Sequence, residues 1–284
     1  GSSNPGPTGG RLMLKTLGKS LLPRSAWALA QRARRRLYLL GYSRRWIERP
    51  YDGTTLRLLI SDPVAEEWYD REWPPQCEFA LLRRHRLRPG AQVFNVGAHQ
   101  AVVALILAAA VGTEGRVIAV EPSRHNVRVA RRNLRANGGG RVRLVRAVVA
   151  DAPGTVLFSE GLNGKVSDGV DDWGLARIPS VTIDDLTQKY GRPDVLFIDV
   201  EGFEARALRG ASQTLRQFGP DCFVEVHVGQ IERYGDSADD VLAFFPPASY
   251  SLFVAAEQDR EFRPLEAARH MLVDRFFLIA VGKA

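Results

Sequence analysis

The sequence has only two cysteines and lacks a long apolar run. Cys77 and Cys222 lie far apart in a chain of 284 residues, and no cysteine pair has zinc-ligand spacing. We therefore expect two reduced, buried thiols and a cytoplasmic protein. The longest apolar stretch, residues 101–111, is shorter than the roughly 18 residues needed to span a bilayer. The sequence thus predicts neither a disulfide-stabilised domain nor a membrane-spanning helix.

Positive charge is concentrated near the N-terminus rather than spread along the chain. The formal net charge is +7, but residues 11–49 hold eleven basic residues and one acid, which leaves −3 for the rest. This distribution does not favour a nucleic-acid-binding role for the whole protein. Residues 1–10, GSSNPGPTGG, are interpreted as an expression tag or disordered lead, and residues 11–90 as a helical N-terminal extension and cap.

An amphipathic helix is predicted over residues 23–40, with arginines 32 and 34–36 on its polar side. Three roles for it are open at this point. It could lie on an anionic surface such as the inner face of a membrane, which would make the protein peripheral there. It could bind phosphate groups, or it could pack against its own domain or against a second copy in a homo-oligomer.

After residue 91 the chain alternates between strand and helix patterns. Helices are predicted over residues 99–111 and 123–137, and earlier over 63–70, where Asp62 is the expected N-cap, and over 76–87. A short strand at 56–60 follows a turn at 51–53. Strands of the main domain are predicted at 91–96, 116–121, 141–149, 194–199, 222–227, 249–254 and 275–281. This order predicts an α/β fold with a doubly wound, mostly parallel seven-stranded sheet in residues 91–284.

A glycine and two acids follow the ends of the first three of these strands. Gly97 allows a tight turn and a close backbone approach to a ligand. The carboxylate of Glu121 can accept hydrogen bonds from both hydroxyls of a ribose, and Asp151 could read an adenine amino group. Taken singly, these are a turn glycine and helix-start acids. Because ligands of such sheets bind at the carboxyl ends of the strands, together they predict a nucleoside site.

Two phosphate-binding motifs are missing from this position. The three glycine positions of G-x-G-x-x-G, counted from Gly97, hold Gly97, His99 and Val102. Residues 18–20, GKS, end like a P-loop, but Met13 stands in place of its first glycine. The nucleoside is therefore expected to lack a pyrophosphate, and S-adenosylmethionine meets that condition.

Several segments carry a family resemblance: NVGAHQA at 95–101, the pair EP at 121–122, VTIDDL at 181–186, IDVEGFEARALRGA at 198–211 and VEVH at 224–227. Over roughly residues 68–281 the chain resembles the FkbM family of S-adenosylmethionine-dependent methyltransferases. The resemblance implies a Rossmann-like class I methyltransferase domain at 91–284. It also implies the cofactor-binding residues Asn95, Gly97, Ala98, His99, Glu121, Pro122, Asp151 and Asp199.

The first motif departs from the family pattern at two positions. Family members usually read DVGANxG, whereas this chain has Asn95 for the aspartate and Ala101 for the last glycine. Losing a carboxylate that complements a cationic cofactor would weaken binding by about 1 kcal/mol at a partly exposed site. The same departures motivate the alternative of a cofactor-binding scaffold without activity.

The predicted fourth and fifth strands bring acids and a histidine to the same edge of the sheet. Asp199 and Glu201 are two residues apart at the end of one strand, and Glu225 and His227 are two residues apart at the end of the next. In an extended strand, each pair points to one side of the sheet. Methyl transfer to a hydroxyl needs a proton acceptor, and we predict Asp199, His227 and Glu201 as catalytic residues. A Mg²⁺ ion held by Asp199, Glu225 and His227 is a second possibility. Alternatively, Glu201 is a helix-start acid and His227 a core histidine.

The acceptor is expected to bind outside the sheet. Trp68, Tyr69, Trp73 and Glu78 precede the first strand of the main domain and could roof the site, or could pack the extension against the domain. Tyr69, Trp73 and Trp173 are the predicted substrate contacts, the last within a polar stretch at 159–179. The family resemblance implies O-methylation of a sugar hydroxyl on a polysaccharide, glycolipid or glycosylated natural product, so the partner is a small-molecule or oligosaccharide acceptor. An RNA or DNA methyltransferase using the arginine-rich arm is the alternative, although no N/D-P-P-Y/W motif is present.

Overall fold

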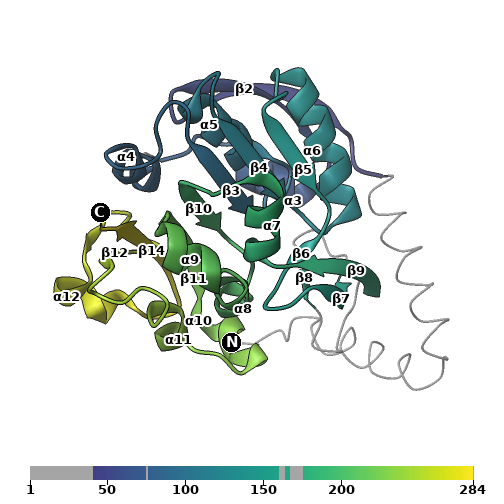
Figure 1. Cartoon of the computed structure of the whole chain (residues 1–284). Helices are drawn as coiled ribbons and strands as arrows, with labels where there is room; N and C mark the ends of the chain where they lie inside the picture. The colour runs from purple at the N-terminus through teal and green to yellow at the C-terminus, as the bar shows by residue number, and fades with distance from the viewer. Residues whose placement is uncertain (1–40, 75, 160–163, 167–174, 284) are drawn as a thin grey trace, which may run out of the picture.

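The computed structural model describes residues 41–74, 76–159, 164–166 and 175–283. Its centre is an eight-stranded sheet (Figure 1). In spatial order its strands are β13 (Arg263–Pro264), β12 (Tyr250–Ala256), β14 (Arg275–Gly282), β11 (Asp221–His227), β10 (Val195–Ile198), β3 (Gln92–Val96), β4 (Arg116–Val120) and β5 (Val142–Val145). The five strands from β11 to β5 are parallel, and β14 runs antiparallel to both β11 and β12.

This topology confirms the predicted doubly wound, mostly parallel sheet. The seven predicted strands are present, and the two-residue β13 adds an edge strand. The predicted strand at 141–149 was wrong in extent, because the chain leaves the sheet after β5. The next segment, β6 (Val148–Val149), joins a separate sheet with β7 (Gly154–Ser159), β8 (Lys165–Val166) and β9 (Leu175–Val181).

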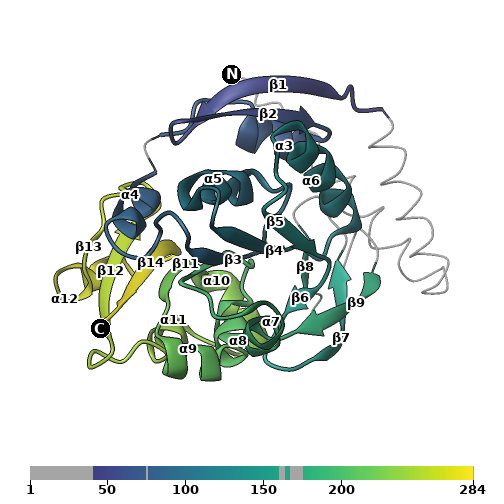
Figure 2. The same cartoon turned by 45° about the horizontal axis from the view of Figure 1, so that its top comes forward.

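The two faces of the sheet bury different hydrophobic clusters, as alternation along each strand requires. Phe197 and Phe223 belong to one cluster, and Leu196 and Val224 to the other. Figure 2 shows α5 and α6 on one side of the sheet and α7, α8 and α9 on the other. The helices of the main domain are α5 (Val102–Val111), α6 (Arg124–Ala136), α7 (Ile183–Tyr190), α8 (Glu204–Arg209), α9 (Ser212–Phe218), α10 (Val228–Ile231), α11 (Ala238–Leu242) and α12 (Leu265–Ala268), with 3-10 turns at Glu232–Tyr234 and Arg269–Met271. Within the described ranges, no helix is long and apolar enough to cross a bilayer.

The N-terminal part of the described chain is a hairpin followed by two short helices, α3 (Pro63–Tyr69) and α4 (Cys77–Arg83). The expectation of a helical extension over 11–90 missed the strand β1 (Arg45–Tyr51), which pairs with β2 (Thr54–Ile60). Its sequence, RWIERPY, mixes charges and a proline with apolar residues and so gives a weak strand signal. The turn at Asp52 and Gly53 has positive φ at both positions, as a tight two-residue hairpin requires. The predicted helix 23–40 lies outside the described residues.

A buried carboxylate ties α3 to the helices beyond β3 and β4. Asp62 is 1% exposed and caps α3, as predicted, by accepting from the Ala65 N–H at 2.9 Å. Its second oxygen lies 2.7 Å from Gln100 Nε2 and 2.8 Å from His125 Nε2. Burial raises the pKa of Asp62, but the hydrogen bonds from His125 and the Ala65 N–H outweigh this effect and lower it to about 2. One ionised side chain therefore joins three segments distant in sequence.

We predict that Asp62→Ala lowers the free energy of unfolding by about 3 kcal/mol, because Gln100 and His125 lose a charged partner and α3 loses its cap. Urea unfolding measures this loss. A lowered folded pKa contributes stability above the unfolded value, 3.8, and that contribution disappears as the pH falls toward 2. The difference between wild type and variant should therefore shrink between pH 5 and pH 3.

The matched control is Glu66→Ala, which removes an exposed ion pair with Arg45. Its loss should stay below about 1 kcal/mol. Equal losses in the two variants, or a loss for Asp62→Ala that does not change with pH, would contradict the assignment.

Candidate active site

The turn after β3 places Gly97 directly against the end of β10. Gly97 has φ +87°, and its N–H and that of Ala98 both donate to the carbonyl of Val120, at 3.0 and 2.9 Å. A Cβ at Gly97 would lie 1.7 Å from the carbonyl oxygen of Asp199. The Asp199 N–H in turn donates to the carbonyl of Val96 at 3.0 Å. The predicted need for glycine here thus arises from both the turn and the neighbouring strand.

The rest of this turn contains two non-glycine residues with positive φ, His99 (+47°) and Ala101 (+68°). Ala101 stands where the FkbM pattern has its last glycine, and its conformation explains why glycine is usual there. A left-handed conformation costs an L-residue roughly 1–2 kcal/mol. At this position the chain therefore adopts the left-handed conformation that favours glycine, with a strained alanine in it.

Glu121, at the end of β4, is 5% exposed and organises the turn. Its Oε2 accepts from the His99 N–H at 2.9 Å, and its Oε1 accepts from the Ser123 N–H at 2.8 Å. Asn126 Nδ2 adds a longer contact of 3.3 Å to Oε1. Burial raises the pKa of Glu121 to about 7, although these hydrogen bonds oppose the change. Near neutral pH this acid therefore titrates.

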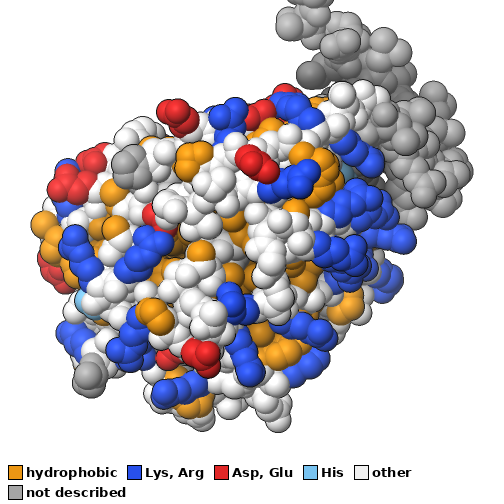
Figure 3. All heavy atoms as spheres, turned by 90° about the horizontal axis from the view of Figure 1, so that it is seen from above, with side chains coloured by type: hydrophobic (Ala, Val, Ile, Leu, Met, Phe, Trp, Pro, Cys, Tyr) orange, Lys and Arg blue, Asp and Glu red, His pale blue; other side chains and the backbone are white. Residues whose placement is uncertain are grey.

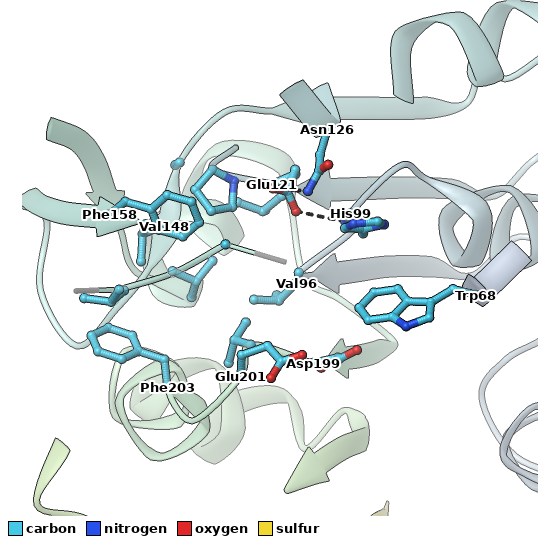
Figure 4. A pocket seen from close by; sticks show the side chains of 18 residues that line it. Trp68, Val96, His99, Glu121, Asn126, Val148, Phe158, Asp199, Glu201 and Phe203 are labelled. Carbon is cyan, nitrogen blue, oxygen red and sulfur yellow. Dashed lines mark hydrogen bonds between the residues drawn. The ribbon is translucent and has the colours of Figure 1, made fainter. Parts of the chain in front are cut away.

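A single pocket brings Gly97, Glu121 and Asp199 together, as the sequence predicted (Figure 4). His99 and Pro122 also line it, as expected for cofactor contacts. Apolar walls come from elements that the sequence did not single out, and Trp68 of α3, one of the aromatics expected to roof the site, also lines the pocket. These additional lining residues include Trp68, Val148, Phe158 and Phe203.

Beside the pocket, Asp199, Glu201 and His227 each present a ligand-type atom, and these atoms lie within 4.8 Å of one another. His227 is 6% exposed, and its Nδ1 lies 2.8 Å from Glu204 Oε1. Its Nε2 has no hydrogen-bond partner and lies 3.7 Å from Glu201 Oε2. Burial lowers the pKa of His227, but the bond to Glu204 and the charge of Asp199 outweigh it and raise it to about 9. Burial and the charge of Glu225 raise the pKa of Asp199.

The predicted metal-ligand set changes in one member. Glu225 is not part of the group of three, although its Oε1 lies 3.5 Å from His227 Nε2; the same oxygen pairs with Arg275 Nη1 at 3.1 Å. Glu201 takes its place. It reaches the cluster from a turn with φ +53°, in which Gly202 follows at +97°. The alternation expected along an extended strand ends at Asp199, where β10 has already finished.

Three predicted cofactor contacts, Asn95, Ala98 and Asp151, lie outside the lining of this pocket. Asn95 is 1% exposed within β3, and Ala98 is 3% exposed beneath the turn. Asp151 is exposed and lies 4.0 Å from Arg206, whereas the pocket wall at this strand end is formed by residues 147–149.

The structure separates the aromatic side chains that were expected to roof the site. Tyr69 is 6% exposed and its hydroxyl lies 2.6 Å from His99 Nδ1, while Trp73 packs edge-on against Tyr51. Trp68 is the residue that lines the pocket, because successive positions of a helix point about 100° apart. The remaining prediction, Trp173, lies outside the described residues.

Glu204 was missed as part of the site. The sequence presents it as an acid at the start of a helix, and its meeting with His227 across two elements has no local signal.

A sheet of this strand order, with a ligand pocket at its carboxyl edge, defines the Rossmann-like class I fold of S-adenosylmethionine-dependent methyltransferases. The FkbM methyltransferase domain family matches residues 95–260, more than half of the chain. The chain belongs to this family and is a methyltransferase. A comparison with curated proteins gives no match.

Solved structures resemble the chain at low identity. A methyltransferase FkbM from Methylobacillus flagellatus KT is 17% identical with a TM-score of 0.45, and the match covers 66% of this chain and 43% of that one. The fibrillarin of Aeropyrum pernix, solved with natively bound S-adenosyl-L-methionine, is 14% identical over 86% of both chains, with a TM-score of 0.46. A SAM-dependent O-methyltransferase from Thermotoga maritima is 14% identical over 84% and 78% of the two chains, with a TM-score of 0.44. The chain thus spans less than half of the Methylobacillus protein.

We predict that Gly97→Ala lowers the free energy of unfolding by more than about 3 kcal/mol, because the new Cβ overlaps the Asp199 carbonyl and must separate β3 from β10. Chemical denaturation measures the loss. Gly138→Ala is the matched control, since Gly138 also has positive φ (+64°) but has open space at its Cβ position. It should lose only about 1 kcal/mol. Similar losses at both positions would show that strain, and not the contact with Asp199, explains the requirement.

Proposed function

We propose that the pocket binds S-adenosylmethionine and that the enzyme methylates a hydroxyl group of a sugar. The observation that carries this proposal is the shared pocket of Gly97, Glu121 and Asp199, which follow the tips of adjacent parallel strands. The acceptor class is a small molecule or an oligosaccharide, in keeping with the FkbM resemblance.

The lining residues fit this donor chemically. Glu121 is a carboxylate acceptor at the wall of the pocket, which suits the two hydroxyl donors of a ribose. Val148 and Phe158 form apolar surface suited to a flat base, while Asp199 and Glu201 supply negative charge suited to a cationic ligand (Figure 4). Because Asn95 is buried away from the lining, its replacement of the family aspartate takes no carboxylate from the pocket wall.

When bound, S-adenosylmethionine supplies a methyl group on a sulfonium that departs as a neutral sulfide. The residues of this chain then have to align the acceptor oxygen and accept its proton. Asp199 and Glu201 line the pocket, and His227 lies behind them with Nδ1 fixed by Glu204. In our proposal the carboxylates of Asp199 and Glu201 accept the proton, while His227, whose pKa is raised, carries positive charge beside them.

A hydroxyl acceptor suits the cluster because an alcohol, unlike a neutral amine, is a weak nucleophile until its proton is removed. The ring of Trp68 lines the same pocket, and its centre lies 5.0 Å from the centre of the His99 ring. Trp68 offers an aromatic surface on which a sugar ring can stack. These features support a sugar as the acceptor.

A divalent cation such as Mg²⁺ is the second part of the proposal. Asp199, Glu201 and His227 would hold it, and the cation would acidify the acceptor hydroxyl. The fit rests on His227, whose Nε2 is buried without a hydrogen-bond partner while Nδ1 is held by a carboxylate. Metal-bound histidines are commonly oriented in this way by a second carboxylate.

We predict that wild type binds S-adenosylhomocysteine and that Glu121→Gln weakens binding about tenfold to a hundredfold, because a charged acceptor is lost. Since the pKa of Glu121 is about 7, the ionised form grows between pH 6 and pH 8, and wild-type affinity should rise over that range. The variant should lack this part of the pH dependence. Isothermal titration calorimetry at each pH measures both effects.

Asp151→Asn is the matched control, because Asp151 also follows a strand end but lies outside the pocket. Its affinity should equal that of wild type. Unchanged binding in Glu121→Gln would remove the ribose contact from the proposal, and absence of binding at millimolar ligand would refute the cofactor site.

For the cation we predict that Mn²⁺, used as a paramagnetic probe for Mg²⁺, binds wild type. Glu201→Gln and His227→Asn should weaken it strongly, and Glu204→Gln about tenfold or more, because Glu204 orients the histidine. Electron paramagnetic resonance of free Mn²⁺ gives the affinity without any need for turnover.

The control for the cation is Glu257→Gln, which should leave Mn²⁺ binding nearly unchanged because Glu257 is partly exposed, pairs with Arg275 and is not part of the group of three. Transfer of labelled methyl to sugar acceptors should disappear in Asp199→Ala. Turnover that persists in EDTA, together with absence of Mn²⁺ binding, would leave proton removal to the side chains and reject the cation.

A further inference from the structure

One stretch of the chain carries positive charge without any acid. Between Glu121 and Asp151 there are eight arginines and no aspartate or glutamate. The structure exposes all eight, on α6 and beside β5. We call them the arginine face: Arg124, Arg128, Arg131, Arg132, Arg135, Arg141, Arg143 and Arg146. The arginine face is thus strongly positive, although residues 50–284 together have a net charge of −3.

The fold explains why these arginines point outward together. α6 buries Val127, Ala130 and Leu134 against the sheet, so its arginines occupy the opposite side. Among the described residues, none of the five α6 arginines pairs with a carboxylate, in contrast to arginines 45, 49 and 209, which do. Figure 3 shows basic side chains gathered on the side of the molecule where α6 lies in Figure 1. The charge of the five α6 arginines is therefore available to a partner.

The arginine face begins at the mouth of the pocket. Arg146 Nε donates to the carbonyl of Pro122 at 3.2 Å, and Pro122 lines the pocket. Arg124 is the first residue of α6, directly after the Glu121 turn. A surface that engages these arginines would hold the pocket opening close to it.

An exposed tryptophan lies near the other end of α6. Asn137, the C-cap of α6, bonds both the N–H and the carbonyl of Arg57 at 2.8 Å. The guanidinium of Arg57 lies over the ring of Trp46, 5.2 Å from its centre, and Trp46 is 43% exposed. One acid is also present at this end of α6, since Glu48 Oε1 lies 3.9 Å from Arg57 Nε. Tryptophan beside clustered arginines is typical of surfaces that meet the headgroup region of a bilayer.

We propose that the arginine face docks the enzyme on an anionic lipid bilayer. Single-stranded nucleic acids are bound by basic grooves with aromatic side chains for base stacking. The arginines of α6 lie on the outward side of a helix, with Trp46 at one end rather than between them, which fits a flat layer of phosphate headgroups better than a groove that stacks bases. Each basic residue close to such a surface adds to binding, and added salt weakens it. This docking is independent of the identity of the methyl acceptor.

The test is flotation of the full chain with vesicles of phosphatidylcholine alone or with 30% phosphatidylglycerol. Wild type should bind only the anionic vesicles and should be released by salt. The triple variant Arg128→Gln, Arg131→Gln and Arg135→Gln should bind them at least about tenfold more weakly. Its unfolding midpoint and its affinity for S-adenosylhomocysteine should match wild type, since these side chains are exposed and lie outside the pocket.

The matched control neutralises Arg84, Arg88 and Arg216, which are equally exposed but lie on other elements. This variant should bind vesicles like wild type. Equal vesicle binding by wild type and the α6 variant, or an equal loss in the control, overturns the proposal. Absence of vesicle binding combined with arginine-dependent binding of an RNA oligonucleotide also overturns it and favours a nucleic-acid partner.

Discussion

The contact between the Gly97 turn and the carbonyl of Asp199 is the constraint on which the site depends. β3 and β10 are neighbouring parallel strands, and the missing Cβ of Gly97 allows their ends to meet. The same turn lets two successive N–H groups reach Val120 on β4. Three strand ends are thereby fixed relative to one another by backbone atoms. The side chains that follow them, Glu121 and Asp199, consequently face one pocket without depending on flexible loops.

The pocket and its surroundings bury several acidic side chains. Glu121 and Glu204 are 5% and 0% exposed, and burial raises the pKa of Glu121 and Asp199. Burying carboxylates without full compensation destabilises the folded state. A cationic ligand offsets that penalty, which is why a sulfonium cofactor, with or without a divalent cation, suits this site better than an anionic nucleotide.

The sequence predicted what regular periodicity and strand order determine. Apolar strands at fixed intervals indicate the sheet, and the rule that ligands bind at strand ends places Gly97, Glu121 and Asp199 together. The sequence says less where a residue's position depends on a change of direction. Which aromatic ring of α3 lines the pocket depends on helix phase, and Glu201 joins Asp199 and His227 because the chain turns at positive φ. The strand β1 was missed because its pairing with β2, rather than its own composition, defines it.

The acidic side chains of the pocket and the arginine face occupy different regions of the molecule that meet at one turn. Acids gather around the pocket, while the arginine face extends from the mouth of that pocket along α6. Both are attached to the same short turn, since Glu121 accepts from Ser123, the N-cap of α6. A helix that starts at the cofactor site and carries five exposed arginines couples the orientation of the enzyme on a surface to the orientation of its pocket. An acceptor presented at that surface would then reach the methyl-transfer site without leaving it.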